Sequence, residues 1–532
     1  MRLFVFSTLF LIFGLNCAES YKILVYANLF GHSHIKFVAS VADTLTDAGH
    51  DVTVLMPVVD FNQRNRTALV SSKKQIFVEP DEKVVELMKE TQKFLTNLWI
   101  ADTSNPVNMW LNSGALVALF GAQCEKVMKS TELLKQLKAE HFDVAITEAF
   151  DSCGYEIIEH LQIPSHISVL SCSRMDHVSS ALGQPIAPSY VPGTQSIYGE
   201  RMNIYERFLN LLQFFAGNAM FADIGDYEFE LAKKVLGVQR SWRQILPETS
   251  FLLTNHIPLL DFPAPTFDKI VPIGGISVQT DWKKLQVPEP WDTMMNMRKK
   301  NVLISFGSNI KSADMPEEFK KSLLEVFQDV SDVTFLWKYE NPADKKLTCG
   351  VLNVNRGEWL PQNEILADPR LDAFITHGGL ASITELAMMG KPAVIVPIFA
   401  DQTRNAEMLK RHGGVEVLHK NDLKNPKKVA ETLRKVMNDP SYRQNAERLA
   451  GMLNNQPTDA KQTLIKHVEF AAKFGKLPTM DPHGRHQSLI EYYLLDIIAI
   501  ALLVISLLFW VVFKILSRIF GTCFGTKKTK SD

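Results

Sequence analysis

The fold is decided by the stretch A-F-I-T-H-G-G-L-A-S-I-T-E-L, which occupies residues 373–386. The apolar run Ala373–Thr376 predicts a buried strand, the H-G-G triplet at 377–379 predicts a tight turn, and the spacing that follows predicts a helix. A strand, a glycine turn and a helix in this order present backbone N–H groups to a phosphate in parallel α/β sheets. We therefore expect a parallel α/β sheet with a ligand site at this turn.

Polar residues on either side of this stretch fall at similar places. The segment W-L-P-Q-N-E-I-L begins at Trp359, and K-P-A-V-I-V-P-I-F-A-D-Q ends at Gln402. Within the second segment, Ala393–Ile398 predicts another buried strand, and Asp401 comes shortly after it. Ligands of open α/β sheets bind beyond the carboxyl ends of the strands, so these polar residues fall where a ligand would bind.

The same alternation of strands and helices extends through both halves of the chain. Strands are predicted at Tyr21–Tyr26, Asp51–Met56, Phe142–Thr147, Ser165–Ser171, Asn301–Phe306 and Val333–Trp337, and helices at Ile35–Ala48 and Pro316–Val330. Between the halves, Val287–Trp291 (V-P-E-P-W) lacks such a pattern and predicts a linker. The expected fold class is α/β, with two Rossmann-like domains facing each other across a cleft.

The two ends of the chain carry apolar runs of different length. Near the start, Arg2 precedes the run Leu3–Leu15, which is too short to cross a bilayer and is typical of a secretory signal peptide. Near the other end, Leu494–Phe513 is close to the roughly 20 apolar residues that a spanning helix needs. Basic residues follow from Lys514 onward, and basic flanks stay in the cytosol. We therefore expect a single-pass type I topology with the body of the chain in the lumen.

These patterns divide the 532-residue chain into predicted segments. They are a signal peptide (1–18), an N-terminal Rossmann-like domain (19–286), a linker (287–298), a C-terminal Rossmann-like domain (299–440), a helical segment returning toward the membrane (441–491), a transmembrane helix (492–513) and a basic tail (514–532).

Charge and cysteines narrow the class of protein. The formal net charge is −1, which gives no electrostatic case for binding nucleic acid. The cysteines at 124, 153, 172 and 349 show no zinc-site spacing and no C-x-x-C pair. An oxidising compartment allows a disulfide among them, although the sequence does not choose the pairing. The only N-x-S/T sequon predicts glycosylation at Asn65.

Two long apolar segments, residues 92–125 and 203–222, interrupt the α/β pattern and are rich in aromatic residues. Helices that line an apolar pocket or touch a membrane surface have this composition, and so do plain core helices. The sequence leaves these alternatives open.

The residues around position 377 suit a nucleotide. Donors for a diphosphate are predicted at the helix N-terminus, namely His377, Gly378, Gly379 and Ser382. Glu385, further along the same helix, can accept hydrogen bonds from ribose hydroxyls. Trp359 offers a flat face for a base, and stacking on such a platform contributes roughly 1–3 kcal/mol. Asp401 and Gln402 offer acceptors and donors suited to sugar hydroxyls.

This pattern resembles the nucleotide-sugar signature of the UDP-glycosyltransferases, and specifically the membrane-bound animal UDP-glucuronosyltransferase type. The resemblance covers nearly the whole chain, including the G-H-S-H turn at 31–34, the S-F-G-S turn at 305–308, the spanning helix and the basic tail. It implies the GT-B fold, in which an N-terminal domain binds the acceptor and a C-terminal domain binds the UDP-sugar. It also implies transfer with inversion and without a metal, and the absence of any D-x-D in the sequence agrees with that.

The resemblance further implies a role for each matching residue. It assigns the uracil to Trp359 and Gln362, the diphosphate to Ser308, His377 and Ser382, the ribose to Glu385, and the transferred sugar to Asp401 and Gln402. His34 would be the general base, because a neutral alcohol attacks weakly and imidazole titrates near neutrality.

Two departures from the family pattern stand out. Family members commonly carry an aspartate that orients the base, and here Glu148 occupies that position with Asp151 close behind. Either carboxylate could support His34, and we favour Glu148. Many relatives also have asparagine two residues beyond the paired glycines, where this chain has Ala381, so one polar contact to the donor is lost.

We therefore expect an endoplasmic-reticulum membrane enzyme, since the final Lys528–Asp532 segment also resembles a dilysine retrieval signal. It would transfer a hexosyl group from UDP-glucuronate or UDP-glucose, used as co-substrate with no other cofactor, to a small lipophilic acceptor. Association with itself or with relatives is left open.

Two other functions compete with this hypothesis. One is a catalytically impaired, UDP-binding paralogue with a regulatory role, which the replacements at Glu148 and Ala381 suggest. The other is a dinucleotide-dependent oxidoreductase, which the sequence disfavours because no G-x-G-x-x-G follows the predicted strand Tyr21–Tyr26.

Overall fold

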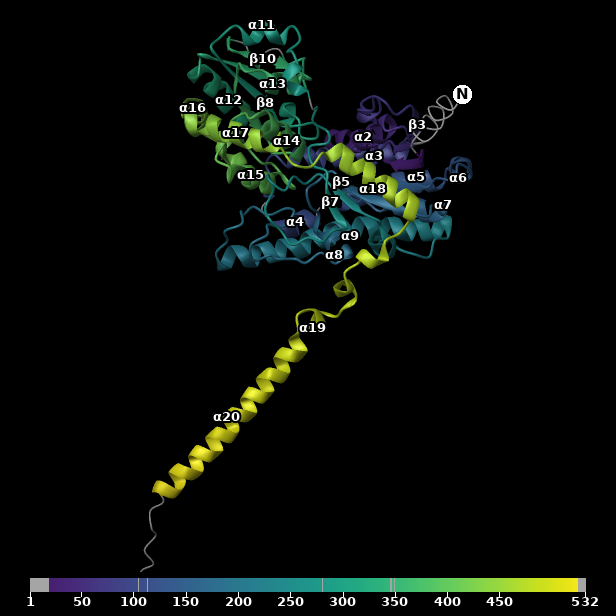
Figure 1. The fold of residues 1–532 in the computed structure, drawn as a ribbon. Helices are drawn as coiled ribbons and strands as arrows, with labels where there is room; N and C mark the ends of the chain where they lie inside the picture. The colour runs from purple at the N-terminus through teal and green to yellow at the C-terminus, as the bar shows by residue number, and fades with distance from the viewer. Residues whose placement is uncertain are drawn as a thin grey trace, which may run out of the picture. The chain divides into compact units, whose positions relative to one another are not determined.

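The computed structural model describes residues 19–524, apart from residues 104, 112, 280, 345, 346 and 349. The chain divides into two compact units, Met1–Asp481 and Pro482–Asp532. The first unit contains two parallel sheets and the second contains a long apolar helix (Figure 1). The predicted signal peptide, Cys349 and the tail lysines beyond residue 524 lie outside the described residues.

The N-terminal sheet has seven strands, all parallel, in the order β3-β2-β1-β4-β5-β6-β7. The strands are β1 (Lys22–Tyr26), β2 (Asp51–Pro57), β3 (Lys74–Val78), β4 (Val144–Glu148), β5 (His166–Leu170), β6 (Leu252–Thr254) and β7 (Ile270–Pro272). In the middle of the sheet, Ile23 of β1 lies opposite Val52 and Val144, and all three are buried. Continuous apolar strands of this kind form sheets that are covered on both faces.

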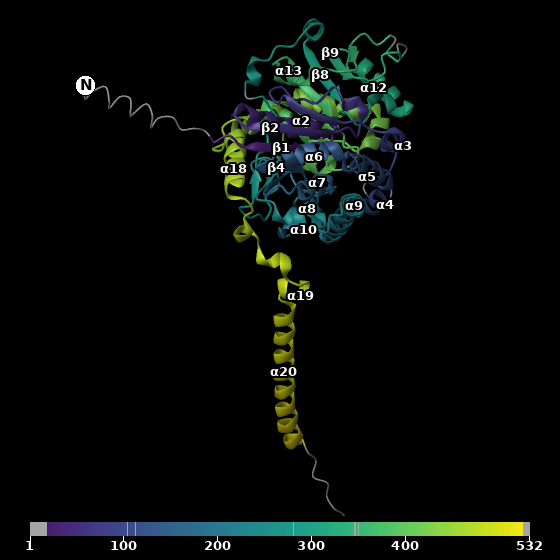
Figure 2. The same cartoon turned by 90° about the vertical axis from the view of Figure 1, so that its right-hand side faces the viewer.

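Helices pack around this sheet (Figure 2). They are α2 (His32–Asp47), α3 (Glu82–Asn97), α4 (Pro106–Leu111), α5 (Gly114–Met128), α6 (Thr131–Ala139), α7 (Cys153–Leu161), α8 (Asp176–Leu182), α9 (Ile204–Leu236) and α10 (Trp242–Ile245). In α2, Ile35, Val38 and Val41 recur at a spacing of three and are buried in the same core as β1. Apolar residues at this spacing share one face of a helix, which explains why α2 packs on the sheet.

A helix near the end of the first unit also belongs to this core. Three apolar residues of α18 (Ala460–Phe474), namely Leu464, Val468 and Ala471, are buried with the residues of α2 and β1. Figure 2 shows α18 beside β1 and β4. The chain therefore returns from the C-terminal domain to the N-terminal sheet before the first unit ends.

The C-terminal sheet has six strands, all parallel, in the order β10-β9-β8-β11-β12-β13. The strands are β8 (Lys300–Ser305), β9 (Val333–Lys338), β10 (Val354–Gly357), β11 (Leu371–Thr376), β12 (Ala393–Ile395) and β13 (Val415–Val417). The helices of this domain are α11 (Trp291–Met295), α12 (Glu317–Asp329), α13 (Gln362–Ala367), α14 (Leu380–Met389), α15 (Gln402–Lys410), α16 (Pro426–Asn438) and α17 (Pro440–Leu453).

Both sheets reverse their strand order at one point. The first and fourth strands of each domain are neighbours, β1 with β4 and β8 with β11, and this is the order of a Rossmann-type sheet. The predicted fold class, with two Rossmann-like domains, is confirmed. Strand β12 stops at Ile395 rather than at the predicted Ile398, because Pro397 has no N–H to donate to a neighbouring strand.

The second unit contains the helix α20 (Leu495–Phe524). Its part Leu495–Phe520 contains an 18-residue window with a mean hydropathy of 2.8 and no buried residue, so it is long and apolar enough to cross a membrane. This matches the predicted span at Leu494–Phe513, although the helix continues past Lys514 and Arg518.

The long apolar segments turn out to serve two purposes. Helix α9 is 33 residues long and packs against α4 and α5. Its residues Met220, Phe221 and Ile224 line the cleft between the domains, whereas Ile204 and Phe208 at its start are exposed. Part of the segment therefore lines a pocket, and part of it faces solvent.

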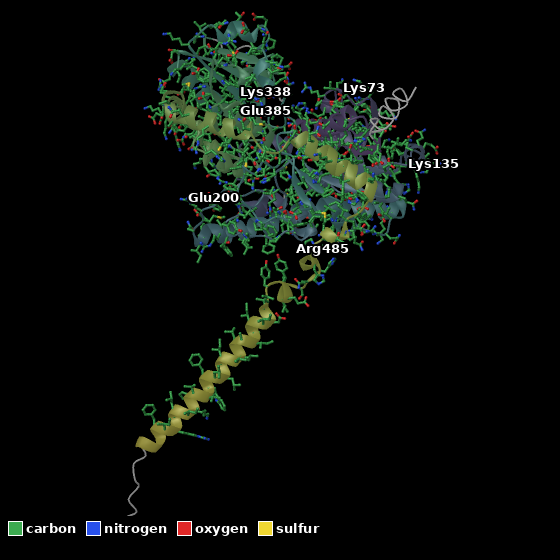
Figure 3. The ribbon with its side chains drawn as sticks, viewed as in Figure 1. Lys73, Lys135, Glu200, Lys338, Glu385 and Arg485 are labelled. Carbon is green, nitrogen blue, oxygen red and sulfur yellow. A yellow bond between two sulfur atoms is a disulfide. The ribbon has the colours of Figure 1, made fainter. Side chains whose placement is uncertain are left out.

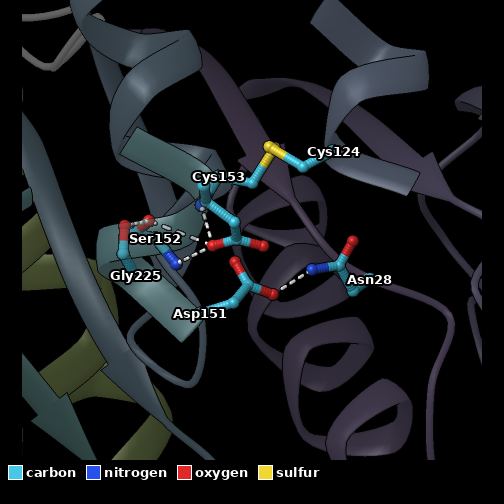
Figure 4. Close-up of a disulfide and its surroundings, with 7 residues drawn as sticks. Asn28, Cys124, Asp151, Ser152, Cys153 and Gly225 are labelled. Atoms are coloured by element: carbon cyan, nitrogen blue, oxygen red, sulfur yellow. Dashed lines mark hydrogen bonds between the residues drawn. A yellow bond between two sulfur atoms is a disulfide. The ribbon is translucent and has the colours of Figure 1, made fainter. Parts of the chain in front are cut away.

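A disulfide joins two helices of the N-terminal domain. Cys124 of α5 is bonded to Cys153, the first residue of α7 (Figure 4). Cys172 is a free thiol. The structure thus selects one pairing among the cysteines that the sequence left open.

Candidate active site

One cleft of about 820 Å³ lies between the two domains. The turns that follow β1, β4, β8 and β11 reach it, so the switch points of the two sheets face the same space. Open α/β sheets bind ligands at this position, which makes the cleft the candidate active site.

His34 enters the cleft from the first turn of α2. Its Nδ1 lies 2.8 Å from Glu148 Oε1 and 2.8 Å from the hydroxyl of Ser171. The backbone N–H of Ser171 also donates to Glu148 Oε1 at 3.2 Å, which fixes the carboxylate. Because Nδ1 is engaged, Nε2 is the ring nitrogen left to take a proton from a molecule in the cleft.

The charges around this pair change both titrations. Burial lowers the pKa of His34, but the charge and hydrogen bond of Glu148 outweigh burial, so the pKa is raised above its ordinary value. Burial raises the pKa of Glu148, but the charge of His34 and the hydrogen bonds from His34 and Ser171 outweigh burial, so this pKa ends below its ordinary value. The pair is therefore poised to hold a proton on the imidazole.

Asp151 forms no hydrogen bond or ion pair with His34 among the contacts of the described residues. One of its oxygens accepts a hydrogen bond from the amide of Asn28, and the other is buried without a partner (Figure 4). Burial, followed by the charges of Glu228 and Glu148, raises the pKa of Asp151 well above its ordinary range. Of the two carboxylates that the sequence offered as partners for the base, Glu148 is the one within hydrogen-bonding distance.

On the opposite wall, His377 lies between two glycines. A Cβ on Gly307 would lie 2.6 Å from His377 Nε2, and a Cβ on Gly379 would lie 2.7 Å from it, so neither position has room for a side chain. Gly307 and Gly378 also have φ of +87° and +90°, which side-chain-bearing residues rarely adopt. The turn brings the imidazole and the N-terminal amides of α14 to the same wall of the cleft.

His377 is neutral at physiological pH. Burial, followed by the charge of Lys338, lowers the pKa of His377 to about 4. Its Nδ1 is buried without a hydrogen-bonding partner. A neutral imidazole at a helix N-terminus can donate one hydrogen bond to an anion, alongside the backbone amides.

Glu385 lies one helical turn beyond this cradle. Its Oε2 accepts a hydrogen bond from Gln362 Nε2 at 2.7 Å, and the same amide is 3.2 Å from the hydroxyl of Ser382. Its Oε1 lies 2.6 Å from the ammonium of Lys36, which comes from the other domain. The carboxylate is therefore held from both domains.

The indole of Trp359 is 48% exposed and lies at the edge of the cleft. The ring of His32 meets it edge-on at 5.4 Å, and the guanidinium of Arg66 lies 5.1 Å from its centroid. Both neighbours come from the N-terminal domain. A base stacked on this indole would lie close to His32 and Arg66.

The loop after β12 is held by its own side chains. Gln402 Oε1 accepts from the backbone N–H groups of Ile398 and Phe399, at 2.9 and 3.1 Å. Asn405 donates to Asp401 at 2.8 Å. These contacts fix the start of α15 at the cleft, so both residues predicted to meet the sugar border it.

Nearly all the predicted site residues meet at this cleft. Those that line it are His34, Ser308, Trp359, Gln362, His377, Gly379, Ser382, Glu385, Asp401 and Gln402. Glu148 and Asp151 line a small void behind His34, and Gly378 supports the turn without lining the cleft. Asn65 is exposed on a loop of the N-terminal domain. In the part of the chain that the structure describes, no cluster of three or more His, Cys, Asp or Glu side chains is arranged to hold a metal ion.

Sequence reasoning missed three residues of the site, namely Lys36, Ser171 and Lys338. Ser171 and Lys338 stand at the carboxyl ends of β5 and β9, where the rule used for Asp401 would have found them. Lys36 gave no such signal, because its partner lies 349 residues away.

The N-terminal wall of the cleft is apolar beyond His34. The side chains there include Phe30, Leu116, Phe150, Met220, Phe221 and Ile224. Such a surface favours a lipophilic molecule, which would lie next to the ring of His34 because Phe150 packs against that ring at 5.0 Å.

Comparison with known proteins identifies the family. The protein-family model described as "UDP-glucoronosyl and UDP-glucosyl transferase" matches residues 21–530. The chain belongs to this family. It is 30% identical over 474 residues to the putative UDP-glucuronosyltransferase ugt-56 of Caenorhabditis elegans, which covers 86% of this chain and 88% of the relative. It is 24% identical over 514 residues to human UDP-glucuronosyltransferase 1A10, which covers 96% of this chain and 94% of the relative.

Solved structures agree with the fold. The glycosyltransferase SnogD from Streptomyces nogalater aligns with a TM-score of 0.53 and 18% identity, over 85% of this chain and 100% of that chain. The glycosyltransferase VinC, solved in complex with dTDP, aligns with a TM-score of 0.53 and 17% identity over the same shares. The chain is thus a hexosyltransferase of the UDP-glucuronosyltransferase and UDP-glucosyltransferase family with the GT-B fold.

Proposed function

We propose that this enzyme transfers a hexosyl group from UDP-glucuronate or UDP-glucose to a hydroxyl of a small lipophilic acceptor, with His34 as the general base. The observation that carries the proposal is the 2.8 Å contact between His34 Nδ1 and Glu148, on the wall of the cleft that faces the α14 cradle. It gives a base with a carboxylate partner beside an apolar wall and opposite an anion site.

The reaction is a single displacement. His34 Nε2 takes the proton of the acceptor hydroxyl, and the oxygen forms a bond to the anomeric carbon. The bond from that carbon to the diphosphate breaks on the opposite face, so the anomeric configuration inverts. UDP leaves with the electron pair, and the N-terminal amides of α14 with His377 stabilise its charge. No step requires a metal ion.

The other site residues hold the donor. Trp359 with Gln362 binds the uracil end and Glu385 the ribose, while Asp401 with Gln402 binds the hexose. Ser308 and Ser382 join His377 at the diphosphate. The support for these roles is that all of these side chains border one cleft.

The proposal places the catalytic domains in the lumen of the endoplasmic reticulum. In this proposal, helix α20 anchors the chain in the membrane and residues 1–18 are a signal peptide that precedes the N-terminal domain. Asn65 carries a glycan. The Cys124–Cys153 disulfide supports this orientation, because disulfides persist in oxidising compartments. Exposure of Asn65 also suits glycosylation.

The alternative is a UDP-binding paralogue that does not transfer. Ala381 motivates it, since this residue lines the cleft without a polar group. Glu148 does not support this alternative, because its longer side chain still reaches His34 at 2.8 Å.

The test is a transfer assay on microsomes that contain the full chain. UDP-glucose and UDP-glucuronate compete for a simple phenol, and mass spectrometry identifies the conjugates. We expect a hexoside or a glucuronide from the wild type and from a His160→Ala control, and on the order of 10²- to 10⁴-fold slower formation of either product by His34→Ala. UDP binding without either product in the wild type would favour the paralogue instead.

A further inference from the structure

The N-terminal end of α2 reaches across the cleft to three parts of the C-terminal domain. Lys36 Nζ lies 2.6 Å from Glu385 Oε1, and the ring of His32 meets Trp359 at 5.4 Å. A Cβ on Gly31 would lie 3.2 Å from the amide nitrogen of Asn309, so this turn also packs on the loop after β8. One short segment of the first domain therefore touches the predicted uracil, ribose and diphosphate regions of the second.

The ion pair is the strongest of these contacts. The Lys36 side chain is 23% exposed and that of Glu385 is 6% exposed, so water screens the pair weakly. Figure 3 labels Glu385 in the C-terminal domain. Gln362 holds the second oxygen of the carboxylate from within that domain. Glu385 is thus a fixed point to which Lys36 attaches.

The two helices that the pair joins carry the two halves of the chemistry. Lys36 stands two residues after His34, in the first turns of α2. Glu385 stands in α14, whose N-terminus forms the anion cradle. Because helices are stiff, a contact between them sets the distance from His34 to the bond that breaks.

We propose that Lys36 is a positioning residue, whose ion pair with Glu385 holds the helix of the base at its working distance from the donor. This rests on the proposed function, in which His34 and the α14 cradle act on one donor. A misplacement of about 1 Å can cost on the order of 10² in rate. A carboxylate has about four lone-pair sites, so Glu385 can accept ribose hydroxyls while Lys36 stays in place.

The test uses the full-length chain in detergent, with the variants Lys36→Met, Lys36→Arg and, as control, Lys22→Met. Lys22 forms an exposed ion pair with Glu140, away from the cleft. We measure kcat, the KM for the acceptor, and the Kd for UDP by calorimetry. Lys36→Met is expected to lower kcat about 10- to 100-fold while the Kd for UDP changes less than about threefold. Lys36→Arg is expected to recover most of kcat, since a guanidinium also pairs with a carboxylate.

Three results would overturn the proposal. These are an unchanged kcat in Lys36→Met, a Kd for UDP that weakens as much as kcat falls, and a Lys36→Arg variant no better than Lys36→Met. The second result would make Lys36 a ligand of the nucleotide rather than a positioning residue.

A stability measurement separates this proposal from the proposed function. In a double-mutant cycle with Glu385→Gln, the combined variant is expected to lower Tm by less than the sum of the two single variants. Additive losses in Tm would show that no pair exists. A wild type that binds no UDP but shows this coupling would contradict the proposed function while leaving the ion pair intact.

Discussion

The two domains share one strand order, and each brings a histidine to its switch point, but the two histidines differ in chemistry. His34 has a raised pKa and lies against the carboxylate of Glu148. His377 has a pKa lowered to about 4 and lies near the ammonium of Lys338. Both residues are partly buried, so burial alone does not separate them.

What separates them is the charge that each sheet places beside the ring. The carboxyl end of β4 supplies Glu148, and the carboxyl end of β9 supplies Lys338. An anion stabilises the protonated imidazole, and a cation does the reverse. The same fold thus makes a proton acceptor in one domain and a neutral hydrogen-bonding group in the other.

The largest effect is expected from removing the base. His34→Ala is expected to lower kcat on the order of 10²- to 10⁴-fold, the usual contribution of a positioned general base. A steady-state assay of the full chain in detergent measures it, with His160→Ala as the matched control. Turnover within about threefold of wild type would show that His34 is not the general base. The proposed difference in function between His34 and His377 would then be wrong.

The next effect comes from removing the carboxylate beside the base. Glu148→Gln is expected to lower kcat/KM on the order of 10²-fold at neutral pH, because the ring loses its orienting charge. Asp151→Asn is the comparison, since Asp151 bonds to Asn28 rather than to His34 and carries a raised pKa. We expect Asp151→Asn to cost less than Glu148→Gln. The opposite order would assign the supporting role to Asp151.

The pH profiles of the wild type and of Glu148→Gln report the direction in which Glu148 shifts the pKa of His34. A base must be unprotonated to act, so kcat/KM falls as pH drops through the pKa of His34. In the wild type this acid limb lies above the ordinary imidazole value of about 6.5, because Glu148 raises the pKa. In Glu148→Gln the contribution of burial remains, and the limb is expected to move to lower pH. A limb that stays in place would mean that another group controls it.

A smaller effect is expected on nucleotide binding from Trp359→Leu. Loss of base stacking, worth roughly 1–3 kcal/mol, weakens the Kd for UDP about 5- to 150-fold. Trp282→Leu is the control, since that indole also packs against the core of the C-terminal domain but does not line the cleft. Equal changes in Kd for the two variants would show that Trp359 does not bind the uracil.

The smallest effect is expected from His377→Ala. A neutral hydrogen bond contributes about 0.5–1.5 kcal/mol, so the Kd for UDP-glucose is expected to rise about 2- to 13-fold. Because His377 stays neutral, wild-type affinity is expected to change less than about twofold between pH 5.5 and pH 8. An affinity that rises steeply toward low pH would mean that His377 binds the diphosphate as a cation.

Much of the fold could be predicted because its strands are continuous apolar runs. Strands β1, β2, β8 and β11 are buried over most of their length, and such runs are readable from the sequence. Strands β6, β7 and β13 were missed, because each has three residues and too few positions to form a pattern. Strands β3 and β10 were also missed, because they are only partly buried and are not continuous apolar runs.

The candidate site was predictable where a residue directly follows a strand, as His377 does, or lies in the loop after one, as Asp401 does. His34 was not predictable in this way and depended on the family resemblance, since a histidine in a turn has no distinctive pattern. Contacts between distant segments were also beyond sequence reasoning. The approach of Lys36 to Glu385, the Cys124–Cys153 pairing and the bond from Asn28 to Asp151 arise only when the chain folds.

The most direct test of the division between the domains is calorimetric titration of UDP into the full-length chain in detergent, as wild type, His34→Ala and His377→Ala. We predict saturable heat with the same Kd for the wild type and His34→Ala, and a weaker Kd for His377→Ala. No heat from the wild type at millimolar UDP, or a loss of affinity in His34→Ala, would contradict the assignment of the nucleotide to the C-terminal domain.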